Sequence, residues 1–402
     1  MTAFRVLNTS ALLISLAAIL SACGSDNATQ SSENVDTTAP TARITFPPPT
    51  SMTEGGSIVV RGTAADASEI TMLRVNGVDA TSSDGFATWE ATVSLAPGNN
   101  NLVVDVSDIA SNTAAAAATA QILVVNDISV SNFPDALNAL NGPLGIALDS
   151  ANSRALVTNS FDGDVVAVDL TTGARTILSD GPSTLWGITL DSANNRALVS
   201  AGSEVVAVDL TSGTRTTLSS AAAQFGSNGI TLDSANNRAL VADFGQKAVI
   251  AVDLTTGART ILSDVTTPDA VNSFSGPVGI TLDSANNRAL VSDDFLSAVV
   301  AVDLTSGART ILSDNTRAFD IVIDSTNSRV LGTSGWITAV DTASGARTII
   351  SGPVTPDAVN AFSFPAGITI DSANNRALVT DDNLDAVFAV DLVNGQRVVI
   401  SR

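Results

Sequence analysis

Short apolar runs separated by polar turns recur along the chain from residue 144 to the C-terminus. Each unit contains four runs, which read Gly-Ile-Thr-Leu-Asp, Arg-Ala-Leu-Val, Val-Ala-Val-Asp-Leu and Arg-Thr-Ile-Leu-Ser in this order. Runs of this length that are bounded by Asn, Asp, Ser and Gly predict β-strands joined by tight turns. The first aspartate of the unit occurs six times, at Asp149, Asp191, Asp233, Asp283, Asp324 and Asp371.

The spacing of these aspartates predicts how the units assemble. Successive copies are 42, 42, 50, 41 and 47 residues apart. Periods of about 40 to 50 residues with four strands each are typical of propeller blades. Because one blade cannot cover both of its own faces, blades stack on their neighbours and close a ring. We therefore expect residues 127–402 to form a six-bladed β-propeller.

The strand that closes this ring has two candidates. Residues 128–131 precede a segment that matches the end of a repeat, so they resemble an extra outer strand. Residues 397–401 already supply the outer strand of the last blade. We expect the C-terminal run to be the outer strand, and residues 128–131 to be either a clasp on the last blade or a packed linker.

Most polar side chains of the repeat are expected to be structural. Each repeat aspartate is followed five residues later by an arginine, as in Asp149 and Arg154, across a four-residue turn. A second pair, as in Asp169 and Arg175, flanks the next turn, with a glycine two residues before the arginine. Glycine there supplies the left-handed backbone conformation that the turn requires. A role repeated around a ring belongs to the scaffold, so we look for function where the repeat is broken.

A second set of short strands precedes the repeats. Runs at 58–62, 70–75, 88–95, 102–106 and 121–125 alternate with turn signals, and Asn76-Gly77 is a strong hairpin signal. This pattern predicts an immunoglobulin-like β-sandwich over residues 41–126. Its strings Gly62-Thr63-Ala64, Trp89 and Asp108-Ile109-Ala110-Ser111-Asn112 resemble bacterial immunoglobulin-like surface modules, which implies a spacer or adhesive unit. Asp105 and Asp108 are a candidate calcium site, although turn capping is the preferred interpretation.

The N-terminus has the features of an export signal. Arg5 is followed by an apolar run from residue 11 to 20, which is too short to span a bilayer. The string Leu20-Ser21-Ala22-Cys23 resembles the lipobox of bacterial lipoproteins, which implies a signal peptide over 1–22 and lipidation of Cys23. Gly24 follows Cys23, and the resemblance then implies the outer membrane. Residues 23–40 are rich in Ser, Thr and Asn and predict a flexible tether.

Composition excludes several classes of function. The chain of 402 residues has a formal net charge of −21, and 35 of its 40 acidic residues are Asp. A nucleic-acid binder needs a basic surface, so no nucleic-acid partner is expected. The chain has no His and one Cys. Histidine-dependent acid–base catalysis, Ser-His or Cys-His nucleophiles, His-ligated zinc and intrachain disulfides are thereby excluded.

The repeats resemble NHL, YVTN and SMP-30/gluconolactonase-like propellers, and Leu156-Val157-Thr158-Asn159 is close to the YVTN string itself. In SMP-30-type lactonases, Glu, Asn and Asp ligands hold a divalent metal where inner strands begin. The corresponding positions here lie five residues before each repeat aspartate. They are Leu144, Trp186, Asn228, Val278, Phe319 and Ala366. Only Asn228 matches the lactonase pattern, and Asp320, one residue after Phe319, is a partial substitute.

The loops that break the repeat gather aromatic and acidic residues on one face of the ring. Aromatic anchors with a polar rim are typical of recognition surfaces. The alternative is that these rings fill loop cavities or the channel, and that the acidic pairs cap turns or bind calcium. We predict non-catalytic recognition of a protein or glycan, with a metal-dependent lactone or ester hydrolase as the alternative. The candidate binding residues are Phe161, Trp186, Asn228, Phe244, Phe274, Asp293, Asp294, Phe295, Asp320, Trp336, Phe362, Asp381 and Asp382.

Overall fold

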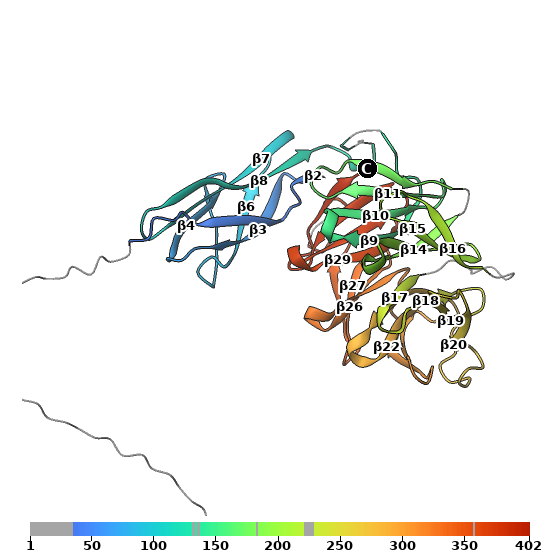
Figure 1. Ribbon diagram of the computed structural model, residues 1–402. Coiled ribbons are helices and arrows are strands. Elements are labelled where there is room, and N and C mark those ends of the chain that lie inside the picture. The colour runs from blue at the N-terminus through green and yellow to red at the C-terminus, as the bar shows by residue number, and fades with distance from the viewer. Residues whose placement is uncertain (1–34, 131–132, 135–136, 182–183, 221–228, 357) are drawn as a thin grey trace, which may run out of the picture.

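The computed structural model describes residues 35–402 except 131–132, 135–136, 182–183, 221–228 and 357. All regular structure in these residues is β-strand or short 3-10 turn. Six sets of four antiparallel strands form the C-terminal part, five as separate sheets and the sixth as part of a larger sheet, and Figure 1 shows them arranged around an axis. The predicted all-β propeller is therefore confirmed. Within the described residues, no helix is long and apolar enough to cross a membrane.

The blades follow one another along the chain without exchanging strands. Their strands are β9 (Pro143–Asp149), β10 (Arg154–Asn159), β11 (Asp164–Asp169) and β12 (Arg175–Ser179) in blade 1; β13 (Leu185–Asp191), β14 (Arg196–Ala201), β15 (Glu204–Asp209) and β16 (Arg215–Ser220) in blade 2; β17 (Ile230–Asp233), β18 (Arg238–Asp243), β19 (Ala248–Asp253) and β20 (Arg259–Ser263) in blade 3; β21 (Pro277–Asp283), β22 (Arg288–Asp293), β23 (Ala298–Asp303) and β24 (Arg309–Ser313) in blade 4; β25 (Ile321–Asp324), β26 (Arg329–Thr333), β27 (Ile337–Asp341) and β28 (Arg347–Ser351) in blade 5; and β29 (Pro365–Asp371), β30 (Arg376–Asp381), β31 (Ala386–Asp391) and β32 (Arg397–Ser401) in blade 6.

The first strand of each blade lines the axis, and each contacts the first strand of the next blade. These contacts run through β9, β13, β17, β21, β25 and β29 and return from β29 to β9, so the ring is closed. The second and third strands are buried over most of their length, as in β10 and β11. Neighbouring blades cover both of their faces, which explains the continuous apolar runs in the sequence.

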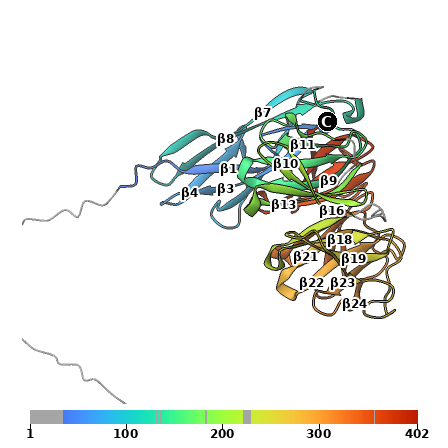
Figure 2. The same cartoon turned by 45° about the vertical axis from the view of Figure 1, so that its right-hand side comes forward.

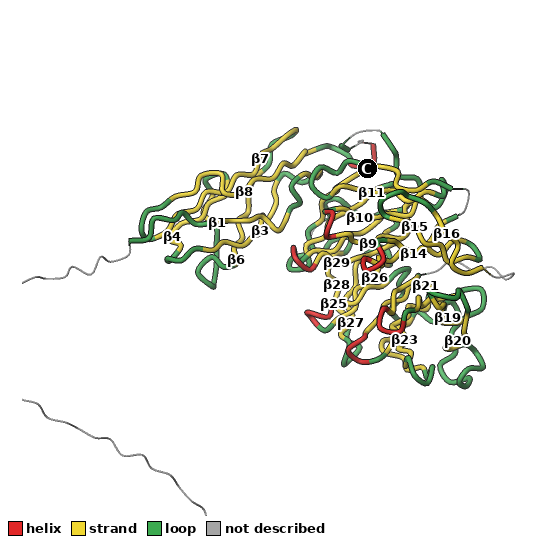
Figure 3. Tube along the Cα trace, viewed as in Figure 1, coloured by secondary structure: helices red, strands yellow, loops and turns green. Residues whose placement is uncertain are grey.

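The repeat aspartate and arginine form the expected scaffold. In every blade the arginine Nε donates to the aspartate across a 3-10 turn, over 2.7–2.8 Å. The residue after each turn adopts a left-handed conformation. Figure 3 shows these turns in red at the edge of the blades. They are η2 (Ser150–Asn152), η3 (Ser192–Asn194), η4 (Ser234–Asn236), η5 (Ser284–Asn286), η6 (Ser325–Asn327) and η7 (Ser372–Asn374).

One hydrogen bond joins the outer strands of all six blades. The serine at the end of each fourth strand donates to the carbonyl of the turn glycine in the next blade, over 2.7–2.9 Å. Ser401 closes the ring by donating to Gly173 of blade 1. A side chain on these glycines would meet the preceding blade, because a Cβ on Gly213 would lie 1.8 Å from the carbonyl oxygen of Leu178. The glycine is therefore required both by its positive φ and by the approach of the next blade.

The closing strand is β32, as predicted. Residues 128–130 form the 3-10 turn η1 (Ile128–Val130) rather than a strand, so the extra-strand alternative is wrong for them. Phe133 exchanges two backbone hydrogen bonds with Arg402, of 3.0 and 2.7 Å, and this pairing fastens the segment before blade 1 to the C-terminus.

The N-terminal strands form two sheets around a shared apolar core. One sheet has the order β1 (Thr41–Phe46), β3 (Ser57–Ala65) and β6 (Thr88–Ser94). The other has the order β5 (Val78–Asp79), β4 (Ile70–Val75), β7 (Gly98–Asp108), β8 (Thr113–Val124) and β2 (Thr50–Thr53). Trp89, Leu102 and Val104 lie in the core between them. The immunoglobulin-like assignment and the boundaries of this module stay predictions.

The second sheet continues into the propeller, which the sequence did not indicate. Strand β2 pairs with β8 on one side and with β32 on the other, through Met52 and Val399, to form one nine-stranded sheet. Figures 1 and 2 both show the blue N-terminal strands beside the red last blade. Arg61 of β3 adds a double hydrogen bond to Asp391, with both distances 2.6 Å. The carboxylate of Asp391 is fully buried.

We expect Arg61→Ala to lower the free energy of unfolding by about 3 kcal/mol, because it leaves a buried carboxylate without its partner. Arg74→Ala is the matched control, since its pair with Asp79 is exposed and worth about 1 kcal/mol or less. Urea unfolding of both variants measures the difference. Equal losses of unfolding free energy in the two variants would contradict a stabilising role for the Arg61–Asp391 pair between the N-terminal sheets and the last blade.

Candidate functional site

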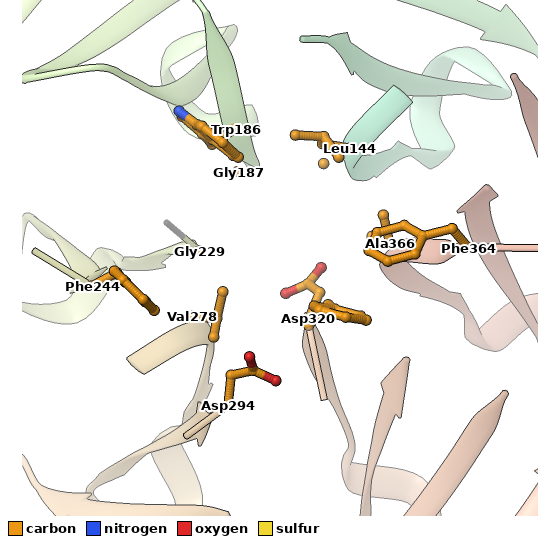
Figure 4. A pocket seen from close by; sticks show the side chains of 13 residues that line it. Leu144, Trp186, Gly187, Gly229, Phe244, Val278, Asp294, Asp320, Phe364 and Ala366 are labelled. Carbon is orange, nitrogen blue, oxygen red and sulfur yellow. The ribbon is translucent and has the colours of Figure 1, made fainter. Parts of the chain in front are cut away.

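A cavity of about 300 Å³ lies at one end of the propeller axis, and we call it the mouth cavity. Every blade contributes to it from the beginning of its first strand, as Figure 4 shows. Five of the six positions singled out in the sequence line it, and the sixth, Asn228, lies outside the described residues. The lining residues are Leu144, Gly145, Trp186, Gly187, Gly229, Phe244, Val278, Asp294, Phe319, Asp320, Phe364, Ala366 and Gly367.

Hydroxyl groups of the second strands hold the lining in place. Thr158 Oγ1 donates to the carbonyl of Trp186 in the next blade over 2.6 Å. Thr380 Oγ1 donates to the carbonyl of Leu144 over 2.6 Å, across the junction between the last and first blades. These bonds fix the backbone of the lining residues between two blades, so the side chains project from rigid strands.

Aromatic rings form much of the wall. Phe319 and Phe364 pack with their centroids 4.7 Å apart. Phe244 makes an edge-to-face contact with Phe295, with centroids 5.2 Å apart. Trp186 faces the cavity from the second blade (Figure 4). Such walls offer flat apolar surfaces to a bound molecule.

Two carboxylates supply the charge of the mouth cavity. Asp294 follows β22 and is bound by Arg317, whose Nε and Nη2 both donate to it. The guanidinium of Arg317 also lies over the ring of Phe319, 5.1 Å from its centroid. The hydrogen bond to Asp294 raises the pKa of Arg317. The pair is therefore a neutral unit at the rim.

Asp320 is the second carboxylate, and it has no basic partner among the described residues. Its Oδ1 accepts from the backbone N–H of Ile321 over 2.9 Å, and its Oδ2 accepts from Ile368 over 3.1 Å. Burial raises the pKa of Asp320 to about 6, against the lowering effect of these two bonds. Figure 4 shows its carboxylate directed toward the middle of the cavity.

Several candidate residues have structural roles instead. Asp293 is fully buried and accepts from the backbone N–H groups of Ser275, Gly276 and Leu296. Asp381 repeats this arrangement in the last blade. Burial raises the pKa of Asp381. These two acidic residues cap loops, which was the alternative to binding.

Phe274 is buried and Phe362 is partly buried, and both pack against neighbouring side chains. Phe274 is 3% exposed in the core between blades, where Arg309 stacks on it. Phe362 packs edge-to-face on Phe388, with centroids 5.1 Å apart, beneath Arg397. Phe274 therefore fills a cavity between blades, which was the alternative to binding, whereas the prediction that Phe362 is a binding residue stays a prediction.

The remaining candidates lie around the rim. Phe161 is 76% exposed and lies beside Asp382 above Gly142. Burial raises the pKa of Asp382, and Asp385 adds to the effect. Phe295 and Trp336 are 65% and 39% exposed, and Trp336 is not among the lining residues. Cys23 lies outside the described residues.

The lactonase pattern of ligands is not assembled by the described residues of the mouth cavity. Asp294 and Asp320 are its only oxygen-bearing side chains there, and Asp294 is already engaged with Arg317. Divalent metals that activate water need several convergent oxygen ligands. Within the described residues, three acidic groups come within 4.8 Å of one another only at Asp36, Asp66 and Asp108, in the N-terminal sheets.

Asp108 of this acidic group is also one of the two residues of the candidate calcium site. Asp108 accepts from the backbone N–H of Asn112 over 2.7 Å, which is the expected turn cap. Asp105 lies in β7 and accepts from the backbone N–H of Ala116 in the paired strand β8 over 2.9 Å, and it is not part of the group. Asp108 also accepts from Ser68 and from the side chain of Asn112. The predicted pairing of Asp105 with Asp108 is therefore not formed, and calcium binding stays a prediction.

Arg317 is the residue that sequence reasoning missed. Twelve of the 18 arginines occupy repeat positions. Arg317 is one of the others, and it stands in a loop where no repeat places a base. This departure from the repeat was the feature of the sequence that could have identified Arg317. Its partner Asp294 could not be identified, because Asp294 lies in a loop within blade 4 and Arg317 lies in the connection from blade 4 to blade 5.

No protein-family model and no curated protein matches this chain. An auxiliary nutrient-binding protein from Bacteroides thetaiotaomicron aligns with a TM-score of 0.55 and 12% identity, over 89% of this chain and 97% of that chain. An auxiliary nutrient-binding protein from Bacteroides ovatus aligns with a TM-score of 0.53 and 11% identity, over 90% and 98%. A gluconolactonase from Xanthomonas campestris has a TM-score of 0.48 and 13% identity, over 61% and 85%. The first two likenesses show a shared fold that includes the N-terminal sheets, since they cover more of this chain than its propeller.

The raised pKa of Asp320 predicts how the stability of the folded protein changes with pH. Because its pKa is raised to about 6 from 3.8, the folded protein binds a proton more tightly than the unfolded chain. The stabilisation is present at low pH and is lost as the pH rises through 6. Wild type should therefore gain up to about 3 kcal/mol relative to Asp320→Asn between about pH 7.5 and pH 4.

Asp303→Asn is the control with the opposite sign. The backbone N–H of Ser306 lowers the pKa of Asp303, so its contribution is present at neutral pH and is lost on acidification. Urea unfolding of the three proteins across this pH range measures both effects. A difference between wild type and Asp320→Asn that does not change with pH would contradict the raised pKa.

Proposed function

We propose that this protein is an exported, lipid-anchored binding protein that holds a glycan in the mouth cavity without chemically changing it. The observation that carries the proposal is the mouth cavity itself, with aromatic walls and two carboxylates on rigid strands. Cavities that are mostly apolar, with a few placed polar groups, are typical of small-ligand sites.

The shape of the site favours a sugar unit over a protein surface. A volume of about 300 Å³ is at the lower end of ligand cavities, which suits one or two sugar rings. A sugar ring presents C–H groups on its faces, which pack on Trp186 and the Phe319–Phe364 pair. Its hydroxyl groups donate at its edge, where Asp294 and Asp320 accept.

Two further observations support binding rather than catalysis. The two structures of highest similarity that we report are named nutrient-binding proteins. The described mouth residues also lack the convergent oxygen ligands that the hydrolase alternative needs. Both observations support recognition over hydrolysis.

The N-terminal sheets then act as a spacer of immunoglobulin-like type over residues 41–126. Their continuous sheet with the last blade holds the propeller at a fixed distance from the tether over residues 23–40. Lipidation of Cys23 would place the molecule at the outer membrane. The exposed rim residues Phe161 and Phe295 extend the binding surface beyond the mouth cavity.

We expect Trp186→Ala to weaken glycan binding at least about fivefold, because stacking on an aromatic ring contributes about 1 kcal/mol or more and the cavity loses a wall. The measurement is calorimetric titration with oligosaccharides of glucose, mannose, xylose and N-acetylglucosamine. Trp336→Ala is the matched control, since Trp336 lies outside the lining. The proposal fails if no oligosaccharide binds, or if the two variants lose affinity equally.

We expect the Cys23→Ser protein to lose both lipid labelling and partition into detergent when it is expressed in a bacterium with two membranes. Its cysteine-free chain then has no thiol for lipid attachment, since Cys23 is the single cysteine. Metabolic labelling with a radioactive fatty acid measures the change, with wild type as the reference. Labelling that persists in Cys23→Ser would contradict the anchor.

A further inference from the structure

We propose that the sugar held in the mouth cavity carries a free, protonated amino group, which binds beside Asp320. This inference rests on the proposed function and specifies its substrate class as an amino sugar. It follows from the polarity of the lining, from an internal example of cation binding, and from the charge balance of Asp320.

The polar side chains of the mouth cavity are almost entirely acceptors. Ionised Asp294 and Asp320 accept hydrogen bonds and cannot donate them. Trp186 is the one lining side chain with a donor, and Figure 4 shows its indole nitrogen on the side away from Asp320. A ligand that satisfies this lining must bring donors, and an ammonium group brings three of them with a positive charge.

The protein itself shows how this rim binds a cation. The guanidinium of Arg317 lies between the carboxylate of Asp294 and the face of Phe319, 5.1 Å from the ring centroid. A carboxylate and an aromatic face together stabilise a cation through ion pairing and a cation–π interaction. Arg317 is thus an internal example of the chemistry that the lining accepts.

Asp320 lies in the same lining without a paired cation among the described residues. It directly follows Phe319 in the chain and lies in the same lining, but within the described residues no Lys or Arg pairs with it. Its two backbone donors use one acceptor position on each oxygen and leave the others available. The other carboxylate of the lining, Asp294, is paired with Arg317 at the rim, so these two charges neutralise each other.

A protonated amine beside Asp320 would neutralise the negative charge of its carboxylate, which has no basic partner among the described residues. Burial disfavours the ionised form of this carboxylate, as its raised pKa of about 6 shows. A nearby positive charge favours the ionised form, whereas a neutral hydroxyl group does so much less. The net charge of −21 also attracts cationic over neutral sugars to the protein.

The test compares two probes that share ring, linkage and length and differ in charge. They are the β-1,4-linked tetramers of glucosamine and of N-acetylglucosamine, titrated by calorimetry into the whole protein at about pH 7 and moderate salt. We expect the glucosamine tetramer to bind at least tenfold more tightly. Asp320→Asn should remove this preference, because it weakens binding of the glucosamine tetramer more than binding of the N-acetylated tetramer. A circular dichroism spectrum that matches wild type shows that the variant is folded.

Asp79→Asn is the matched control for unspecific attraction of a cation to an acidic protein. It removes the same charge from an exposed position in the N-terminal sheets, and should leave the preference intact. Equal affinity for the two tetramers in wild type would overturn the amino-sugar inference while the proposed function stands. An equal loss of the preference in Asp79→Asn and Asp320→Asn would also overturn the amino-sugar inference. If neither tetramer binds to the wild-type protein, the result counts against both the inference and the glycan proposal.

Discussion

The structure depends on one hydrogen bond that is repeated six times around the ring. A serine at the end of each outer strand donates to the carbonyl of a turn glycine in the next blade, and Ser401 completes the circle at Gly173. The contact requires glycine, because a Cβ there would enter the neighbouring backbone. Since every blade is attached in the same way, the ring is rigid, and the few positions that differ between blades are held at defined places on its axis.

The lining of the mouth cavity combines apolar walls with two carboxylates that have different partners. Asp294 is neutralised by Arg317, whereas Asp320 is left with two backbone donors and a raised pKa. Burial of a carboxylate without a basic partner lowers the stability of the folded protein, so folding does not explain why Asp320 occupies this position. Recognition of a donor-rich ligand provides an explanation, and it links the electrostatics of the mouth cavity directly to the proposed binding of a sugar.

Periodicity made the architecture predictable, but it did not reveal what joins the two parts of the molecule. The six units, the scaffold role of the Asp–Arg pairs and the outer strand β32 followed from local patterns that each unit repeats. The pairing of Met52 with Val399 joins residues at opposite ends of the chain, and no local pattern encodes it. The same limit applied to Phe274 and Asp293, because a loop residue looks the same in sequence whether it faces solvent or the core.

The amino-acid sequence alone determined the class of fold and the number of blades, since strand period and turn chemistry act over a few residues. The positions that line the channel were predicted from the resemblance of the repeats to SMP-30-type propellers. The sequence also determined that histidine chemistry is absent. Only the tertiary structure decided which aromatic rings border a cavity, which aspartates cap loops, and which carboxylate lacks a basic partner among the described residues. Those properties depend on side chains from different blades that meet at the axis, and their distances are set by ring closure rather than by neighbours in the chain.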